Sequence, residues 1–187
     1  MIHFVHVPEP QVFREQAAVP GMRWLAEHPE GRPPPLWRGF REHLADGFRN
    51  LCAYSAMYEP VGTVDHWVSI LEDRSRAYDW TNYRFASSWM NACKSGAMSA
   101  ELLDPFVVQN GWFEILLPSL QLVATEAVPE EFRGRAEHVL NRLRLRDDER
   151  LLRQRREWYR MYQDGELTLE GLASKAPLIA TAVRASQ

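Results

Sequence analysis

The central part of the chain, residues 52–96, combines two short apolar stretches with one helical pattern. The first apolar stretch covers residues 52–58 and the second covers residues 63–70, with Pro60 and Gly62 between them. Proline presets one backbone dihedral and glycine tolerates unusual ones, so both residues are typical of tight turns. Two apolar stretches around such a turn predict a β-hairpin.

The next regular element expected after this hairpin is a helix over residues 85–95. Ser87 or Ser88 could cap its first turn, because a serine hydroxyl accepts hydrogen bonds from free amides there. Gly96 is suited to end it. The intervening residues 72–83 are polar and irregular, which indicates a loop. The centre of the chain is therefore expected to fold as two strands followed by a helix.

Helices are expected on both sides of this unit. Apolar residues recur at spacings of three and four between residues 36 and 51, which predicts one helical face. Residues 130–163 also look mostly helical, and residues 167–185 could form one or two short helices. Near the start, residues 11–27 suggest short helical pieces, and residues 2–7 suggest a strand or an extended arm.

The length of 187 residues favours one domain with a substantial core, although two small lobes are also compatible with it. We expect an α+β fold in a single domain over residues 1–187. Its strand–strand–helix core covers residues 50–97, and the flanking helical parts cover residues 36–49 and 103–187.

Composition excludes several classes of protein. The net charge of −3 shows that the chain is not basic as a whole, so contact with nucleic acid would need a local basic patch. Two cysteines cannot build a disulfide framework, which fits a reducing, cytoplasmic setting. No apolar run approaches the roughly 18 residues of a membrane span, and the N-terminus has no signal-peptide pattern. We therefore expect no membrane association.

Residues with suitable chemistry for phosphodiester hydrolysis are concentrated in the central stretch. Asp65 and His66 follow a short apolar strand, and Asn91 lies on the expected helix. Histidine can accept a proton near neutral pH, and oxygen ligands suit hard divalent cations. Neighbours on a strand point to opposite faces. Asp65 and His66 could therefore serve one site only if the strand bulges or ends there.

This ordered set resembles the HNH nucleases, whose metal site lies on a β-hairpin followed by a helix, the ββα-metal core. The phrase AYDWTN, which ends at Asn82, is similar to the YDWNN of that family. The resemblance implies that His66 is the general base and that Asp65 and Asn91 bind one Mg²⁺ or Mn²⁺. It places Asn82 in the catalytic set as the residue that holds the loop behind His66. It also implies that Lys94, one helical turn after Asn91, meets a phosphate.

The chain departs from the family at the structural zinc. Many HNH proteins carry two Cys-x-x-Cys pairs, but only Cys52 of the first pair is present here, and the second pair would fall on Ser87 and Met90. Serine and methionine are poor zinc ligands. We therefore expect no structural zinc, with aromatic packing holding the hairpin on the helix instead. The aromatic residues expected to do this are Tyr54, Trp80, Phe85 and Trp89.

Residues 142–160 contain eight arginines among several acidic residues. One interpretation is a solvated helix with ion pairs between successive turns. The other is a face that binds the phosphate backbone or a partner, with Arg153, Arg155 and Arg156 as the candidates. Such a helix is similar to those of HNH proteins in bacterial anti-phage systems. One of these, the Septu nuclease, works beside an ATPase, so the similarity suggests a protein partner.

Three hypotheses follow. The first is an HNH-type, metal-dependent endonuclease acting on DNA, which could belong to a bacterial defence complex. The second is a catalytically silent HNH-like adaptor that binds nucleic acid or a protein, which the missing zinc ligands favour. The third is an unrelated helical interaction module. No Walker loop, glycine-rich dinucleotide turn or G-x-S-x-G elbow supports nucleotide or serine hydrolase chemistry. The sequence leaves DNA versus RNA, nicking versus double-strand cleavage and oligomeric state open.

Overall fold

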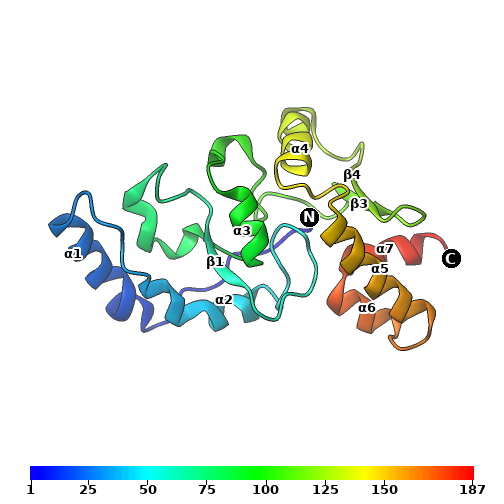
Figure 1. Cartoon of the computed structure of the whole chain (residues 1–187), viewed down its shortest axis with the longest axis horizontal. Coiled ribbons are helices and arrows are strands. Elements are labelled where there is room, and N and C mark those ends of the chain that lie inside the picture. The colour runs from blue at the N-terminus through cyan, green and yellow to red at the C-terminus, as the bar shows by residue number, and fades with distance from the viewer.

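The computed structural model describes all 187 residues and contains seven α-helices and two separate antiparallel sheets of two strands each (Figure 1). The first sheet pairs β1 (Thr63–His66) with β2 (Tyr83–Ala86). The second pairs β3 (Phe113–Leu116) with β4 (Gln121–Ala124). The mixed α+β class expected from the sequence is confirmed, but the second sheet was not predicted.

The helices occupy most of the segments where the sequence predicts them. The long helical region divides at residues 143–148, and the C-terminal segment forms two helices. None of the helices is both long and apolar enough to cross a membrane. Their bounds are α1 Val19–Glu27, α2 Arg41–Gly47, α3 Ser88–Lys94, α4 Glu130–Arg142, α5 Glu149–Gln163, α6 Leu169–Lys175 and α7 Pro177–Ala185. Short turns of 3₁₀-helix precede α2 at Leu36–Phe40 and lie at Arg74–Tyr78 and Trp80–Asn82.

The predicted hairpin between residues 52–58 and 63–70 is wrong. The strand β1 pairs instead with β2, so that Asp65 lies opposite Arg84 and His66 lies opposite Tyr83. Residues 52–58 form a compact loop that is closed by a single bridge between Leu51 and Tyr58. The two strands of the real pair are joined by residues 67–82, a long connection that a search for tight turns cannot detect.

The helix α3 follows β2 after a single residue, which completes a strand–strand–helix unit. Ser87 caps the helix, since its hydroxyl oxygen accepts a hydrogen bond from the Met90 amide at 3.1 Å. Beyond the helix, Gly96 has a φ of 78°, a left-handed conformation that glycine adopts without strain. Both ends of this helix are therefore as the sequence predicts, and its side chains contact β1.

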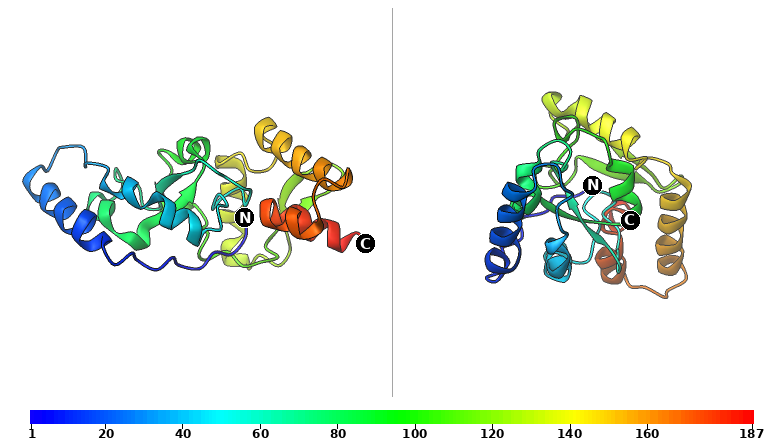
Figure 2. Two further views of the ribbon diagram at one scale, coloured as in Figure 1. Left: turned by 90° about the horizontal axis from the view of Figure 1, so that it is seen from below. Right: turned by 60° about the vertical axis from the view of Figure 1, so that its left-hand side comes forward.

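One apolar core of 44 buried residues extends from Met1 to Val183. Residues 2–7 form an extended arm rather than a strand. Figure 2 shows this arm running from the middle of the molecule toward α1, and Ile2, Phe4 and Val7 of the arm are buried. Four hydrogen bonds fix it. Trp80 Nε1 donates to the Val7 carbonyl and the Phe4 amide to the Pro105 carbonyl, while His3 bonds to the Asn110 side chain and the Val108 carbonyl. Of the aromatic residues expected to pack the unit, Tyr54, Trp80 and Phe85 are buried, and Trp89 is partly buried.

Candidate functional site

His66 is the last residue of β1, and its side chain is held in one orientation. Its Nε2 atom lies 2.9 Å from the Ala77 carbonyl oxygen. A carbonyl can only accept, so Nε2 carries the proton and Nδ1 has a free lone pair in the neutral ring. Burial lowers the pKa of His66 below its usual value, and the Ala77 carbonyl partly opposes this shift. The imidazole is therefore neutral near pH 7, which is the state that a general base needs.

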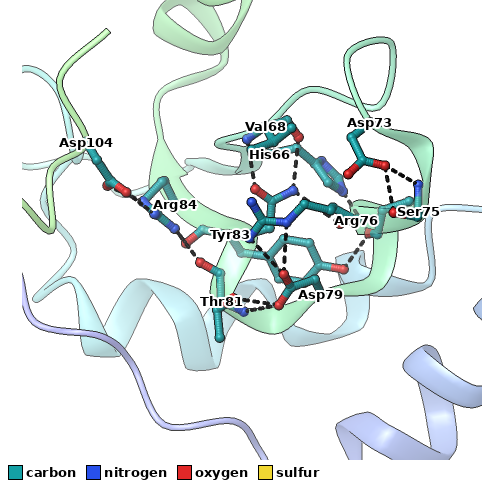
Figure 3. Close-up of polar contacts among 12 residues, drawn as sticks. His66, Val68, Asp73, Ser75, Arg76, Asp79, Thr81, Tyr83, Arg84 and Asp104 are labelled. Carbon is teal, nitrogen blue, oxygen red and sulfur yellow. Dashed lines mark hydrogen bonds and ion pairs between the residues drawn. The ribbon is translucent and has the colours of Figure 1, made fainter. Parts of the chain in front are cut away.

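Two aromatic rings fix the imidazole from either side. The Trp37 ring meets it edge-on at a centroid distance of 4.6 Å, and the Tyr83 ring does so at 5.1 Å. The Tyr83 hydroxyl also donates to the Ala77 carbonyl, at 2.8 Å, so that carbonyl accepts two hydrogen bonds (Figure 3). Only 9% of His66 is exposed. A reactant could therefore approach the imidazole only where Trp37 and Tyr83 do not cover it.

Asn82 holds the loop that supplies the Ala77 carbonyl. Its Oδ1 accepts from the Val68 amide at 2.8 Å. Its Nδ2 donates to the carbonyls of Val68 and Arg76, at 2.9 and 3.1 Å. The side chain is fully buried. These hydrogen bonds tie Asn82 to both ends of the loop segment between Val68 and Arg76, and the catalytic role that the resemblance implies for Asn82 stays a prediction.

Asp65 points away from His66, as alternation along a strand requires. Its Oδ2 accepts from the Tyr54 hydroxyl at 2.5 Å, and its Oδ1 lies 3.3 Å from the Lys94 ammonium. Only 2% of Asp65 is exposed. Burial raises the pKa of the Tyr54 hydroxyl well above its ordinary value, and the neighbouring carboxylate adds to this shift, so tyrosine stays the donor.

Lys94 does not lie where a phosphate could reach it, so the expectation of a nucleic-acid contact there is wrong in this structure. Its ammonium donates to the His66 carbonyl oxygen at 2.6 Å as well as pairing with Asp65, and the residue is 3% exposed. The packing of α3 on β1 directs the lysine inward. A buried carboxylate is stable only with a partner of opposite charge, and Lys94 supplies it.

Asn91 lies one turn before Lys94 on the same face of α3 and is partly buried. Its Nδ2 is 3.5 Å from the Val64 carbonyl oxygen, at the limit of a hydrogen bond. The side chain therefore faces β1 next to the Asp65 position, but it has no strong partner there. Asn91 and Asp65 are brought to the same side of the strand–helix contact, whereas the ring of His66 lies on the other face of β1.

Asp65 and Asn91 carry oxygen atoms of the kind that bind hard cations, but the Asp65 oxygens are already engaged. A carboxylate and an amide oxygen are ligands that Mg²⁺ accepts, and Mg²⁺ keeps several waters when it binds to few protein groups. No cluster of three His, Cys, Asp or Glu side chains that could hold a metal occurs in the chain. Both Asp65 oxygens already have partners, so the Lys94 ammonium has to leave Oδ1 before a cation can use it.

The positions where the family's second Cys pair would fall have other roles here. Ser87 caps α3, and Met90 is fully buried in the core. Cys52 is buried and Cys93 is partly buried, and neither forms a disulfide.

The arginines of α5 divide into two kinds. Arg155 is 1% exposed and donates to the carbonyls of Leu120, Leu145 and Arg146, so the expectation that it binds a phosphate backbone is wrong. Carbonyl groups left free by the turn before α5 and by the β3–β4 turn are satisfied by this guanidinium. Arg153 and Arg156 are exposed, which is compatible with either interpretation of the helix.

Sequence reasoning missed three groups around the imidazole: Trp37, the Ala77 carbonyl and the Tyr83 hydroxyl. A backbone carbonyl leaves no signal in the sequence. Trp37 belongs to the apolar pattern at residues 36–51, and that pattern carries no signal of its contact with His66. No protein-family model matches the chain, and no curated protein matches its sequence.

Proposed function

We propose that this chain is an HNH-like, metal-dependent nuclease that hydrolyses phosphodiester bonds of DNA. The observation that carries the proposal is the state of His66. Its imidazole is neutral, its Nε2 is fixed to the Ala77 carbonyl, and its Nδ1 is free to accept a proton. The order of two strands and a helix, with Asp65 and Asn91 on facing elements, supports the same proposal.

In the proposed reaction, His66 Nδ1 takes the proton of the water that attacks phosphorus. The Ala77 carbonyl then stabilises the imidazolium, because Nε2–H donates to it more strongly once the ring is charged. Asn82 keeps this carbonyl in place through its hydrogen bonds to the loop. Asp65 and Asn91 would hold a divalent cation, which supplies charge stabilisation at the phosphate. Because these two side chains lie on the other face of β1 from the His66 ring, the end of β1 would have to turn for the cation and the imidazole to meet at one phosphate.

Cleavage of supercoiled plasmid and of single-stranded DNA, with Mg²⁺, Mn²⁺ or EDTA, tests the proposal. We expect metal-dependent cleavage that His66→Ala lowers by at least about 100-fold, since general bases contribute about 10²–10⁴-fold. His138→Ala is the matched control, because His138 is exposed on α4. Cleavage by His66→Ala at the wild-type rate would remove the imidazole from the mechanism.

The buried pair of Asp65 and Lys94 favours a second candidate, a silent HNH-like adaptor that binds nucleic acid or a protein. In an adaptor the lysine would replace the cation permanently. Titration with Mn²⁺ separates the two functions. A nuclease should bind Mn²⁺ more weakly after Asp65→Ala or Asn91→Ala. A wild-type chain that binds no Mn²⁺ and cuts nothing would leave the adaptor as the better description.

A further inference from the structure

A groove of about 940 Å³ lies between the Pro-rich loop after α1 and the segment that precedes the Arg74–Tyr78 turn. In Figure 1 this is the end of the molecule that contains α1, opposite the end formed by α5, α6 and α7. We call it the Arg–Trp groove, after the side chains that give it its character. These are Arg32, Trp37, Arg38 and Arg74, with Ile70 on the apolar wall.

The Arg–Trp groove is positively charged although the whole chain is negative. Three guanidinium groups line it and Glu30 is its only carboxylate. Arg32 and Arg38 are exposed, and neither takes part in any of the ion pairs of the protein. On α5, by contrast, Arg156 and Arg160 pair with carboxylates. Two free guanidiniums beside one groove complement an anionic ligand.

The walls of the groove are fixed in place. Arg74 donates to the carbonyls of His28 and Gly31, at 2.6 and 2.5 Å, which ties the loop to the opposite wall. The Tyr78 hydroxyl donates to the Pro34 carbonyl at 2.7 Å. Consecutive prolines at residues 33–35 restrict the backbone further. Binding of a ligand would therefore cost little free energy for ordering the walls of the groove.

Trp37 connects the groove to His66. It lines the groove, and the edge of its ring meets the imidazole at a centroid distance of 4.6 Å. The aromatic wall of the groove therefore contacts the proposed general base, although His66 itself does not line the groove.

We propose that the Arg–Trp groove binds a single-stranded segment of nucleic acid, with phosphates at Arg32 and Arg38 and a base against Trp37. The choice of a nucleic acid rests on the proposed function. A concave basic groove with an aromatic side chain suits single strands, whose bases are free to stack. A duplex is read instead by elements that project into its grooves, and its bases are already stacked. Volumes of about 300–1,000 Å³ enclose drug-sized ligands, which corresponds to a few nucleotides and not to a duplex.

Fluorescence anisotropy with a labelled short single-stranded oligonucleotide, in EDTA, tests this proposal without any cleavage. We expect the wild type to bind the single strand at least about tenfold more tightly than a hairpin duplex of related sequence. Arg32→Gln/Arg38→Gln should lower the slope of log K against log salt by about 1.4, since each phosphate contact on a single strand contributes about 0.7. Trp37→Ala should weaken binding about tenfold or more, and Trp37→Phe should restore most of it.

The matched control removes two charges elsewhere. Arg144→Gln/Arg184→Gln changes exposed arginines toward the other end of the molecule and should leave the salt slope unchanged. An equal effect of both double variants, equal affinity for duplex and single strand, or equal binding of polyglutamate would overturn the proposal. If cleavage depends on His66 while the groove variants bind normally, only the groove assignment fails. If binding follows the groove but no cleavage occurs, only the nuclease fails.

Discussion

At the scale of the residue, the pair of Asp65 and Lys94 determines what the site can do. The carboxylate is 2% exposed and the ammonium belongs to a residue that is 3% exposed, so each charge depends on the other. We predict that Lys94→Met destabilises the protein by about 3–5 kcal/mol, because it leaves a buried carboxylate without a counter-charge. Urea unfolding at pH 7 measures the change.

Two further variants sharpen this test. Asp65→Asn/Lys94→Met removes both charges and should be more stable than Lys94→Met alone. Arg133→Met breaks an exposed ion pair with Glu130 and should cost less than about 1 kcal/mol. If Lys94→Met were as mild as Arg133→Met, the pair would not be buried in solution.

His66 gives a prediction about pH. Burial lowers its pKa in the folded chain, whereas the unfolded chain has the ordinary value of about 6.5. Below that value the unfolded state binds more protons, so the contribution of His66 to stability is complete above about pH 6.5 and is lost as the pH falls toward the lower, folded pKa. We predict that the urea midpoint falls less steeply between pH 7 and pH 5 in His66→Gln than in the wild type.

The exposed His138 provides the reference for this comparison, since His138→Gln should retain the wild-type slope. The charged groups near His66 act in opposite directions, because Asp65 raises its pKa and Lys94 lowers it. A wild-type midpoint that depends on pH no more than that of His66→Gln would show that the imidazole is not buried in its neutral form.

At the scale of the element, the loop at residues 67–82 positions the backbone around His66. It joins β1 to β2 and brings the Ala77 carbonyl to His66. Its two ends are linked by the hydrogen bond from the Val68 amide to Asn82 Oδ1. We predict that Asn82→Ala destabilises the protein by about 2–4 kcal/mol, because three hydrogen bonds of about 0.5–1.5 kcal/mol each are lost in a buried place. Thermal unfolding measures this. Asn141→Ala, at an exposed position on α4, should cost less than about 0.5 kcal/mol.

The elements also show what local patterns can and cannot predict. The start of α3 at Ser87 and its end before Gly96 were predictable, because caps depend on adjacent residues. The pairing of β1 with β2 was not, since the strong turn signal at Pro60 and Gly62 pointed to a nearer partner. The strands β1 and β2 are paired across the loop at residues 67–82 and not across the turn at residues 59–62.

At the scale of the whole molecule, burial explains the charged residues that the sequence misassigned. Lys94 was expected to meet a phosphate because of the family resemblance, and Arg155 because it belongs to the arginine-rich stretch at residues 142–160. Each instead satisfies buried acceptors, a carboxylate and a carbonyl for Lys94 and three carbonyls for Arg155. Which acceptors become buried depends on how distant segments pack, and composition does not record this. Of the two arginines that line the groove without an ion pair, Arg32 lies in the Pro-rich loop after α1 and Arg38 lies in the Leu36–Phe40 turn.

The last prediction concerns the core of 44 buried residues. It includes residues of α2, near the middle of the molecule, and of α7, toward the end opposite α1 (Figure 1), and the Tyr58 amide also donates to the Lys175 carbonyl at 2.7 Å. We therefore expect one cooperative unfolding transition, with coincident far-UV circular dichroism and tryptophan fluorescence. Leu44→Ala in α2 and Ile179→Ala in α7 both truncate buried side chains and should each cost about 2–5 kcal/mol. Because the core is shared, either variant should move both signals together. If Ile179→Ala shifted one signal and left the other at its wild-type midpoint, the chain would consist of two independently folding units.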